Sequence, residues 1–381
     1  MEKKKIIIFI DWYLPGYKAG GPIQSISNLV DHLKDEFDFY IVTRDTDYCE
    51  SIPYPNIISN QWNVSEDGVN VFYFSQNNLT RSNIRKLLRQ TAFDSVYLNG
   101  IFSLYFTLLP LYYLRTYKHK KVVIAARGML AESALGVKKI KKRFFLRAVK
   151  TLNLFDQVIF HASTENEKVD IRKVLGNSME IEIAGNLPQR NVSEKNSEKI
   201  KTAGTLKLVS VARIAPEKNL LFALQILKHV KESVSFDFYG PVYNTEYWEA
   251  CKVEMKQLPP NVLVSYRGSL ESNKVLSHLE KYHMLFMPTR GENFGHIILQ
   301  SLSVGCPVII SDQTPWKNLK KENVGWDLSL QDLSAFASAI DKAAVMDQQE
   351  YAQMSNAAYD FAKKYMNDPE IVKQNRHLFN V

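Results

Sequence analysis

The stretch MLFMPTRGENFGHIILQSLSVGCPVI, residues 284–309, decides the fold. Its first four residues are large and apolar, and they predict a buried strand that ends at Pro288. Gly291 and Gly295 permit a tight loop, and the apolar periodicity that follows predicts a helix beginning near Gly295. A second apolar strand is predicted over Pro307–Ile310. This order predicts a parallel βαβ unit, in which the first free N–H groups of the helix form an anion site.

The same alternation of short apolar strands and helical stretches runs along both halves of the chain. Apolar runs that are buried on both faces are typical of parallel sheets. In the first half a helix is predicted over Pro22–Leu33, and the predicted strands are Lys5–Ile10, Phe37–Val42, Val69–Phe74, Ser95–Leu98, Lys121–Ala126 and Gln157–His161. In the second half the predicted strands are Leu206–Val211, Ser235–Tyr239, Asn261–Tyr266, Met284–Met287 and Pro307–Ile310.

Between the two halves lies a polar segment, residues 189–204, QRNVSEKNSEKIKTAG, which shows no apolar periodicity and is predicted to be a linker. We therefore expect two doubly wound α/β domains, residues 1–188 and 205–365. The C-terminal tail, residues 366–381, is expected to pack back on the first domain. Ligands of such sheets bind at the carboxyl ends of the strands, so a site between the two domains is expected.

Composition excludes several classes of protein. The chain has 381 residues, of which 45% are hydrophobic and 12% aromatic, which excludes a disordered chain. Cys49, Cys251 and Cys306 are too few and too widely spaced for a disulfide framework or a zinc site, which favours a reducing compartment. The longest uncharged apolar run, Ile101–Leu114, is shorter than the roughly 20 residues of a membrane-spanning helix and predicts a buried helix. With no signal peptide recognised, we expect a cytoplasmic protein.

Positive charge is concentrated in one segment. Residues 1–190 carry a net charge of +7, residues 191–381 only +1, and residues 118–150 hold eleven Lys and Arg against Glu132 alone. Within that segment Lys138–Lys150 has the pattern of an amphipathic helix. It can dock on its own domain with a solvated basic face, or it can contact an anionic lipid surface or a phosphorylated acceptor. Nucleic acid is not expected, because no nucleic-acid-binding module accompanies the charge.

Three stretches carry candidate chemistry. Arg213 and Lys218 lie on a predicted strand-to-helix connection, where they can neutralise a diphosphate or remain solvated surface charges. Glu292 lies in the loop before the predicted helix and can accept hydrogen bonds from sugar hydroxyls. Gln300 can both donate and accept, which suits a ribose diol. A third stretch, Gly20-Gly21, follows the first strand and lets the backbone approach a phosphate, although it is not a dinucleotide fingerprint.

Together these stretches resemble the retaining glycosyltransferase family 4, whose members have the GT-B fold. The matching elements are the Gly20-Gly21 loop, the Arg213 and Lys218 pair, and the block from Glu292 to Val308, which resembles the family's E-x7-E element followed by G-x-P-V. The resemblance implies two Rossmann-like domains that face a central cleft. It also implies metal-independent, retaining hexosyl transfer from a nucleoside-diphosphate sugar, with no cofactor. Bacterial members commonly build capsule, O-antigen or exopolysaccharide, which implies a saccharide acceptor, free or lipid-linked, at the inner face of the cytoplasmic membrane.

The resemblance also implies a role for each residue on the donor side. Arg213 and Lys218 would hold the donor diphosphate, and Glu292 would contact the donor sugar. The backbone of Asn293-Phe294-Gly295 would add N–H donors to the phosphates. Gln300 stands where the family normally has the Glu that binds the ribose, so the element here reads E-x7-Q.

Three more residues are candidates for the two substrates. Arg127 and Asn99 are predicted at strand carboxyl ends and would face the acceptor. Arg127 stands where many relatives have His, as in a polysaccharide-synthesis subgroup with Arg-Gly-Met at this place. His296 follows Gly295 and either adds a donor at the phosphates or is a surface residue at the helix start.

Other classes of function stay open. Asp45-Thr46-Asp47 resembles the metal-binding D-x-D of the GT-A transferases, or it is a solvated loop. The His residues form no metal-ligand pattern, so no metal site is expected. A nucleotide-sugar epimerase of GT-B-like fold, which would release an isomer of its sugar nucleotide, is one alternative to glycosyl transfer. A non-catalytic nucleotide- or carbohydrate-binding subunit is another.

Overall fold

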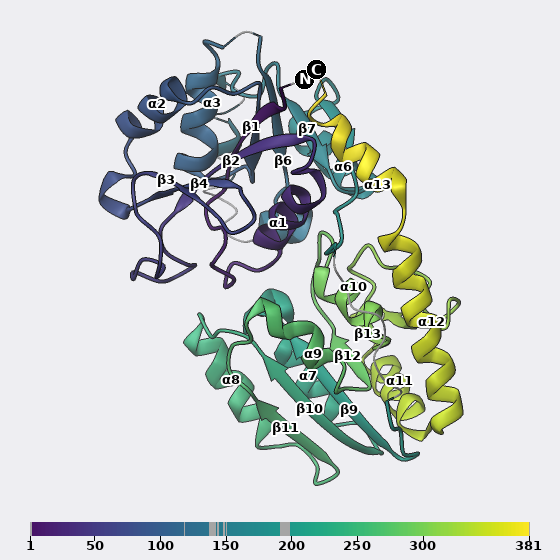
Figure 1. Ribbon diagram of the computed structural model, residues 1–381. Helices are drawn as coiled ribbons and strands as arrows, with labels where there is room; N and C mark the ends of the chain where they lie inside the picture. Colours follow the sequence, from purple (N-terminus) through teal and green to yellow (C-terminus); the bar gives the residue numbers. More distant parts are fainter. Residues whose placement is uncertain are drawn as a thin grey trace. The chain divides into compact units, whose positions relative to one another are not determined.

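The computed structural model describes residues 2–117, 119–136, 142, 145–147, 149, 151–190 and 199–380. The chain divides into two compact units (Figure 1). Unit 1 comprises Met1–Arg190 and Pro369–Val381, and unit 2 comprises Asn191–Asp368. Most of the basic segment predicted over Lys138–Lys150, and residues 191–198 of the predicted linker, lie outside the described residues.

Unit 1 is built on an eight-stranded sheet in the order β3-β4-β2-β1-β5-β6-β7-β8. Neighbouring strands pair in parallel except for the edge strand β3, which runs antiparallel to β4. The strands are β1 (Lys4–Phe9), β2 (Phe37–Arg44), β3 (Trp62–Val64), β4 (Asn70–Phe74), β5 (Ser95–Asn99), β6 (Lys121–Ala125), β7 (Ile159–Ala162) and β8 (Glu180–Ile183). The helices include α1 (Gly21–Leu33), α2 (Arg81–Gln90), α3 (Leu109–Leu114), α4 (Glu132–Gly136), α6 (Glu165–Leu175) and α13 (Pro369–His377).

Unit 2 is built on a six-stranded parallel sheet in the order β11-β10-β9-β12-β13-β14. The strands are β9 (Thr205–Val211), β10 (Ser233–Tyr239), β11 (Val262–Tyr266), β12 (Met284–Met287), β13 (Val308–Ser311) and β14 (Gly325–Leu328). The helices include α7 (Leu220–Leu227), α8 (Thr245–Met255), α9 (Val275–Leu279), α10 (His296–Ser303), α11 (Leu333–Val345) and α12 (Gln348–Met366).

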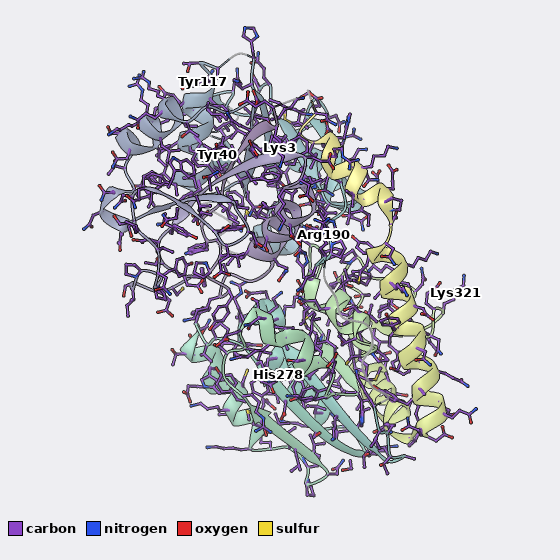
Figure 2. All side chains as sticks on the ribbon, viewed as in Figure 1. Lys3, Tyr40, Tyr117, Arg190, His278 and Lys321 are labelled. Carbon is purple, nitrogen blue, oxygen red and sulfur yellow. The ribbon has the colours of Figure 1, made fainter. Side chains whose placement is uncertain are left out.

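Alternating side chains of the unit 2 strands fill two cores, one on each face of the sheet. Leu208 and Phe286 join the apolar cluster that contains side chains of α7 and α11. Their chain neighbours Val209 and Leu285 join the cluster that contains side chains of α10 and α12. Because successive side chains of a strand point to opposite faces, a continuous apolar run buries both. Figure 2 shows side chains filling the layers between the sheets and the helices in both units.

Both sheets reverse their strand order at one place. In unit 2 the chain moves from β9 to β10 on one side and returns to β12 on the other. In unit 1 the corresponding central strands are β1 and β5. At such a switch point the loops that follow the two strands diverge to opposite faces of the sheet, which leaves a crevice at the strand carboxyl ends.

Every strand predicted from the sequence is present, with its ends shifted by at most two residues. Three strands were not predicted: β3, β8 and β14, each of which lies at the edge of its sheet. An edge strand has a neighbour on one side only, so it can be short and half-exposed. The alternating sequence EIEI of β8 shows why such a strand lacks the apolar run that marks a central one.

The buried helix predicted over Ile101–Leu114 is corrected. The segment forms a π-helical turn, η2 (Leu104–Leu108), followed by the six-residue helix α3. One face of this segment is exposed, because Leu104 keeps 45% and Tyr112 58% of their surface accessible. Over the described part of the chain, no helix combines the length and the apolar character needed to span a membrane.

The C-terminal helix α13 packs within unit 1, although α12 precedes it in unit 2. The Arg376 guanidinium donates to both carboxylate oxygens of Glu36, over 2.5 and 2.7 Å. Phe379 contacts the rings of Phe37, Phe39 and Tyr97. Leu378 and Phe379 therefore lie in the core of the unit in which the chain begins.

Candidate active site

The loop that leaves β9 is held by its neighbours at the switch point of unit 2. Gly240, which follows β10, has a φ of 150°, and a Cβ there would lie 1.9 Å from the Ala212 carbonyl oxygen. Asn219 adopts a left-handed conformation, and its side-chain Nδ2 donates to the Pro288 carbonyl at 3.0 Å. Its Oδ1 accepts from Arg290 Nε at 3.1 Å. Asn219 therefore joins the loop after β9 to the loop after β12, a role that the sequence analysis missed.

The structure brings two of the predicted catalytic residues into contact. Lys218 Nζ, from the loop after β9, lies 2.5 Å from Glu292 Oε1, from the loop after β12. The same oxygen accepts from Thr289 Oγ1 at 3.2 Å, and the Glu292 N–H donates to the Gln313 carbonyl at 3.0 Å. The Glu292 side chain keeps only 11% of its surface exposed and that of Lys218 21%. An ion pair with little exposed surface thus joins the loops that follow β9 and β12.

The start of α10 lies in the same loop as Glu292. Gly295 has a φ of 78°, and a Cβ there would lie 2.8 Å from Ile298 Cδ1, so the turn requires glycine. It provides no side chain that caps the helix. The Phe294 ring is buried against Trp316, and Trp316 Nε1 donates to the Phe294 carbonyl at 2.6 Å. These contacts fix the backbone of residues 293–296 at the positive end of the helix dipole.

The other predicted donor-side residues lie nearby in sequence but engage different partners. The Arg213 guanidinium contacts Glu217 Oε1 at 3.3 Å and keeps about a third of its side chain exposed. His296 is the first residue of α10, and its ring contacts the Phe294 ring, with centroids 4.8 Å apart. Gln300 is half-buried on α10, and among the described residues none hydrogen-bonds its side-chain amide. Its amide is therefore available to a ligand.

In unit 1, Gly20 is the N-cap of α1 and Gly21 its first residue, one position before the predicted start at Pro22. Gly20 has φ 71° and ψ −125°, a conformation that side-chain-bearing residues avoid. Its carbonyl accepts from the N–H groups of Ile23 and Gln24, which starts the helix. No atom lies within 4 Å of a Cβ built at either glycine, so the backbone borders open space.

Arg127 and Asn99, the two predicted acceptor-side residues, contact each other. Arg127 has a φ of 51°, which turns the chain after β6. Its Nε donates to Asn99 Oδ1 at 2.8 Å, its Nη1 to Asn186 Oδ1 at 2.7 Å, and its Nη2 to the Tyr97 hydroxyl oxygen at 2.9 Å. All three guanidinium nitrogens thus have protein acceptors, and Arg127 organises the polar groups at the strand ends.

The hydrogen bonds around Arg127 have one consistent direction. His161 Nε2 lies 2.8 Å from the Ala184 carbonyl, which can only accept, so this nitrogen carries the proton. His161 Nδ1 therefore accepts from the Tyr97 hydroxyl at 2.7 Å, and Tyr97 accepts from Arg127. Burial and then the Arg127 charge lower the pKa of His161 to about 3, and burial raises the pKa of Tyr97 to about 12. At neutral pH both groups are uncharged and structural.

A buried carboxylate that the sequence analysis missed supports the same strand ends. Glu167 of α6 accepts from the Gly128 N–H at 2.5 Å and from the N–H and hydroxyl of Ser163, each at 2.7 Å. It is 5% exposed. Its place one turn into a helix that follows β7 could have marked it, because carboxylates are favourable there.

Asp45 and Asp47 of the D-x-D sequence have protein partners. The Asp47 carboxylate accepts from the backbone N–H groups of Tyr17, Lys18 and Tyr48. Asp45 accepts from the Ser59 hydroxyl at 2.7 Å. These hydrogen bonds hold the loop after β2 in one conformation. Within the described residues, no group of three or more His, Cys, Asp or Glu side chains is arranged to hold a metal ion.

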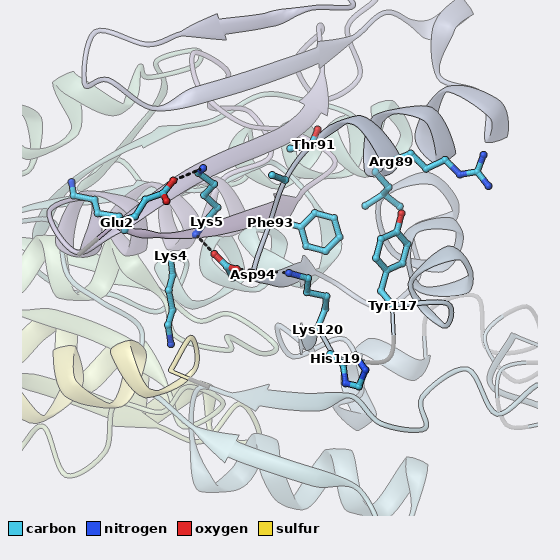
Figure 3. Close-up of a pocket in the computed structure, with 13 residues that line it drawn as sticks. Glu2, Lys4, Lys5, Arg89, Thr91, Phe93, Asp94, Tyr117, His119 and Lys120 are labelled. Atoms are coloured by element: carbon cyan, nitrogen blue, oxygen red, sulfur yellow. Dashed lines mark hydrogen bonds and ion pairs between the residues drawn. The ribbon is translucent and has the colours of Figure 1, made fainter.

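A basic pocket of about 640 Å³ lies in unit 1 where β1, β5 and β6 begin (Figure 3). In it Lys5 pairs with Glu2 at 2.9 Å, and Lys120 lies 3.7 Å from Asp94. The Lys120 ammonium also lies 5.7 Å from the centre of the Phe93 ring. None of the predicted site residues lines this pocket, which is at the amino ends of the strands. It is therefore separate from the candidate site.

Comparisons with known proteins decide the fold. Residues 192–361 match the family model described as glycosyl transferases group 1. The comparison with curated proteins gave no match. Among solved structures, sucrose-phosphate synthase from Thermosynechococcus elongatus is similar with a TM-score of 0.72 at 12% identity, over 99% of this chain and 98% of that chain. The fold is GT-B.

Two further GT-B structures align along almost the entire chain. HepE from Anabaena, in complex with UDP and glucose, has a TM-score of 0.72 at 12% identity, with 98% of each chain covered. WaaG, a glycosyltransferase involved in lipopolysaccharide biosynthesis, has a TM-score of 0.66 at 13% identity, again with 98% of each chain covered. The GT-B prediction is therefore confirmed. The family match falls on unit 2, which contains the Lys218–Glu292 pair.

Proposed function

We propose that this protein is a retaining, metal-independent glycosyltransferase of family 4 that moves a sugar from a nucleoside-diphosphate sugar to a saccharide acceptor. The observation that carries the proposal is the Lys218–Glu292 pair, 2.5 Å apart at the switch point of unit 2. It combines a cation for phosphate, a carboxylate for sugar hydroxyls and an adjacent helix N-terminus in one crevice. The match of residues 192–361 to the glycosyl transferases group 1 supports it.

The donor would bind in unit 2. Arg213, Lys218 and the backbone N–H groups at the start of α10 would hold the diphosphate, with His296 as a further donor. Lys218 has three N–H donors, so it can keep its bond to Glu292 while it donates to a phosphate oxygen. Glu292 has a second carboxylate oxygen for sugar hydroxyls, and the Gln300 amide would bind the ribose diol. The bound UDP of HepE makes UDP-sugars the first donors to test.

The chemistry requires stabilisation of a leaving diphosphate. The bond between the anomeric carbon and the diphosphate oxygen breaks, and the acceptor oxygen bonds to that carbon from the same face. The proton of the acceptor hydroxyl moves to the leaving diphosphate, so no carboxylate nucleophile is needed. Negative charge grows on the diphosphate in the transition state. Preorganised cations and N–H groups at that place are the largest catalytic term in such a reaction.

Unit 1 would bind the acceptor and complete the donor phosphate site through the Gly20-Gly21 backbone. Because the Arg127 guanidinium has three protein acceptors, Arg127 would act by fixing the Asn99 amide, which can then face the acceptor. The role of WaaG in lipopolysaccharide biosynthesis supports a bacterial cell-surface polysaccharide as the product. The acceptor would then be a saccharide, free or lipid-linked.

We also propose that the enzyme works at the inner face of the cytoplasmic membrane through Lys138–Lys150. Seven Lys and Arg and no acidic residue in that segment support an anionic partner. Neutralising four of these charges should weaken association with vesicles of anionic lipid by about 1 kcal/mol per charge at low salt. Unchanged binding would leave only a solvated surface.

The enzyme assignment is tested by a thermal-shift screen against UDP- and GDP-sugars, followed by incubation of the best ligand with saccharide acceptors. A ligand that binds only the folded state raises the melting temperature. The expected product is a glycoside whose NMR coupling constants show the donor's anomeric configuration. An isomerised sugar nucleotide would instead identify the epimerase. Tight binding with no turnover on any acceptor would identify a non-catalytic subunit.

A further inference from the structure

The switch point of unit 1 carries a cluster of side chains that neither the sequence analysis nor the proposed function assigns. Asp11 and Trp12 follow β1, Arg44 ends β2, and Ser103 follows β5. The Ser103 hydroxyl donates to Asp11 Oδ1 at 2.9 Å and accepts from the Phe106 N–H at 3.2 Å, which starts the π-helical turn η2. A side-chain bond thus spans the two central strands where α/β sheets bind ligands.

Arg44 is held by rings instead of by hydrogen bonds. Its guanidinium carbon lies 5.8 Å from the centre of the Trp12 ring and 5.2 Å from that of Phe106. Its Nη2 lies 3.6 Å from Asp11 Oδ1, an ion-pair distance that is longer than a hydrogen bond. Within the described residues no acceptor hydrogen-bonds a guanidinium nitrogen of Arg44, and its buried Nε has no partner. The guanidinium is therefore oriented by the two rings and by its ion pair with Asp11, and it can still donate hydrogen bonds to a ligand.

The cluster remains accessible to a ligand. The Arg44 side chain keeps 28% of its surface exposed and that of Asp11 23%. Trp12 is half-buried, and its ring meets the Tyr48 ring edge-on, with centroids 4.9 Å apart. Burial raises the pKa of the Asp11 carboxyl, against the opposing effects of Ser103 and Arg44. Asp11 holds Arg44 through one ion-pair contact at 3.6 Å without a hydrogen bond, which leaves guanidinium donors for a second anion.

We propose that Asp11, Trp12 and Arg44 form an acceptor subsite that binds a saccharide carrying an anionic group. Arg44 would pair in bidentate geometry with a carboxylate or phosphate of the acceptor, because a planar guanidinium fork matches both. Asp11 would accept a sugar hydroxyl, and the indole of Trp12 would cover the apolar C–H groups of the ring. This inference rests on the proposed function, which assigns the acceptor to unit 1.

The test is saturation-transfer NMR of the full chain with glucuronate, glucose 1-phosphate and glucose, in the presence of saturating UDP. UDP is added so that the phosphate site proposed for unit 2 is occupied. Three proteins are compared: the wild type, Arg44→Met, which keeps an apolar stem between the rings, and Arg81→Met as a control. Arg81 is an exposed arginine at the start of α2. The UDP-induced thermal shift is recorded for all three.

We expect an anionic probe to give a signal in the wild type and in Arg81→Met. The signal of that probe should be at least fivefold weaker in Arg44→Met. Glucose should give little signal in any of the three proteins. A stronger response to glucuronate identifies a carboxylated acceptor, and one to glucose 1-phosphate a phosphorylated acceptor. Equal signals in the wild type and Arg44→Met, equal signals for glucose and the anions, or no signal from either anion would overturn the subsite. A missing UDP shift with an intact, Arg44-dependent sugar signal would instead contradict the donor site.

A second variant keeps the subsite testable where Arg44→Met does not fold. Asp11→Asn retains an oxygen acceptor for Ser103 and removes the negative charge 3.6 Å from Arg44. The signal of methyl phosphate, an anion with no sugar hydroxyl for Asp11 to bind, should therefore rise. A fall or no change would contradict an anion at Arg44.

Discussion

The switch point of unit 2 and that of unit 1 occupy the same place in their sheets, but their polar groups are arranged differently. In unit 2 the loops after β9 and β12 are joined by the Lys218–Glu292 pair. In unit 1 the loops after β1 and β5 are joined by the Ser103–Asp11 hydrogen bond. One strand further along, the Arg127 guanidinium is committed to three uncharged oxygen acceptors.

The difference shows how one architecture serves two tasks. A lysine with a single carboxylate partner can share its remaining donors with a phosphate, which suits a site that binds and releases a charged ligand. A guanidinium with every nitrogen bonded to a buried network rigidifies the strand ends instead. The sheet topology therefore places the loops of both switch points, and the residues of these loops decide which side chains keep donors for a ligand and which are held in a network.

The largest expected effect is on catalysis, through the residues of unit 2. Replacing Arg213 or Lys218 by Ala should lower kcat by about 10²–10³-fold, because each is proposed to stabilise charge that grows on the leaving diphosphate. The donor KM should change less. Steady-state kinetics with Lys274→Ala, which loses only an exposed pair with Glu271, provides the control. If both variants kept full turnover, the proposal that the donor binds at these loops would be wrong.

The next effect is on the stability of unit 1. Arg127→Leu should lower the free energy of unfolding by about 3 kcal/mol, because it leaves three acceptors without their charged donor. That corresponds to a fall in melting temperature of roughly 6–12 °C for a unit of this size. Lys274→Ala, which loses only an exposed pair with Glu271 in unit 2, should leave the melting temperature nearly unchanged. If the two variants melt alike, Arg127 is not the organiser of these strand ends.

Acid should weaken both units through buried histidines. Burial lowers the pKa of His161 in unit 1 to about 3 and that of His283 in unit 2 to about 4, against 6.5 as the ordinary value. Below about pH 6.5 the unfolded chain therefore binds protons at these two histidines that the folded chain does not bind. This stability is complete above about pH 6.5 and is lost as the pH falls towards these values. From pH 7 to pH 5 the loss is about 2 kcal/mol per histidine.

Urea unfolding at the two pH values measures this loss. His161→Gln should remove the contribution of unit 1, because its amide can still donate to Ala184 and accept from Tyr97 without titrating. His283→Gln should act likewise in unit 2. A pH dependence that neither variant reduces would show that other groups control the acid transition.

A smaller effect is expected at the ribose. Gln300→Ala should raise the donor KM about fivefold with little change in kcat, because the ribose is remote from the reacting bond and is held equally in the ground and transition states. Gln300→Glu restores the pattern of the resembling family and should be tolerated. A large loss of kcat in Gln300→Ala would mean that this amide acts nearer to the bond that breaks.

The smallest expected effect is that of a chelator. The groups proposed to hold the diphosphate are Arg213, Lys218 and backbone N–H donors, so EDTA should leave turnover almost unchanged. Asp45 and Asp47 are bonded to Ser59 and to backbone N–H groups of unit 1. If EDTA abolished activity and Mn²⁺ or Mg²⁺ restored it, the metal-free mechanism would be contradicted. These two carboxylates would then be the candidate metal ligands.

The loop that is proposed to bind the donor could be predicted because its residues are close together in the sequence. Glu292, Gly295 and Gln300 lie within nine positions of one another, and the strand before them has an unbroken apolar run. Local patterns of this kind mark a loop between a buried strand and a helix. What the sequence did not show is that Asn219 and Thr289 join the loops after β9 and β12, by donating to the Pro288 and Glu217 carbonyls.

For unit 1 the sequence predicted Arg127 and Asn99, but it predicted neither their partners nor the cluster around Asp11, because the spacing of these residues carries no pattern. Asp11 and Ser103 are 92 positions apart and meet only because β1 and β5 are neighbours in the sheet. Arg127 and Asn186 meet for a similar reason, 59 positions apart. Strand order depends on the packing of both faces of the sheet, and no local run of residues encodes it.

By itself, then, the sequence determined two doubly wound sheets, the strands at their centres and the loop that carries Glu292, because buried strands need unbroken apolar runs and tight turns need glycine. Only the tertiary structure decided which side chains meet. It bound Arg127 to three uncharged acceptors, paired Lys218 with Glu292, and placed Arg44 between two rings without a hydrogen bond. Hydrogen bonds and ion pairs act over a few ångströms, so their partners are known only when the chain has brought distant segments together.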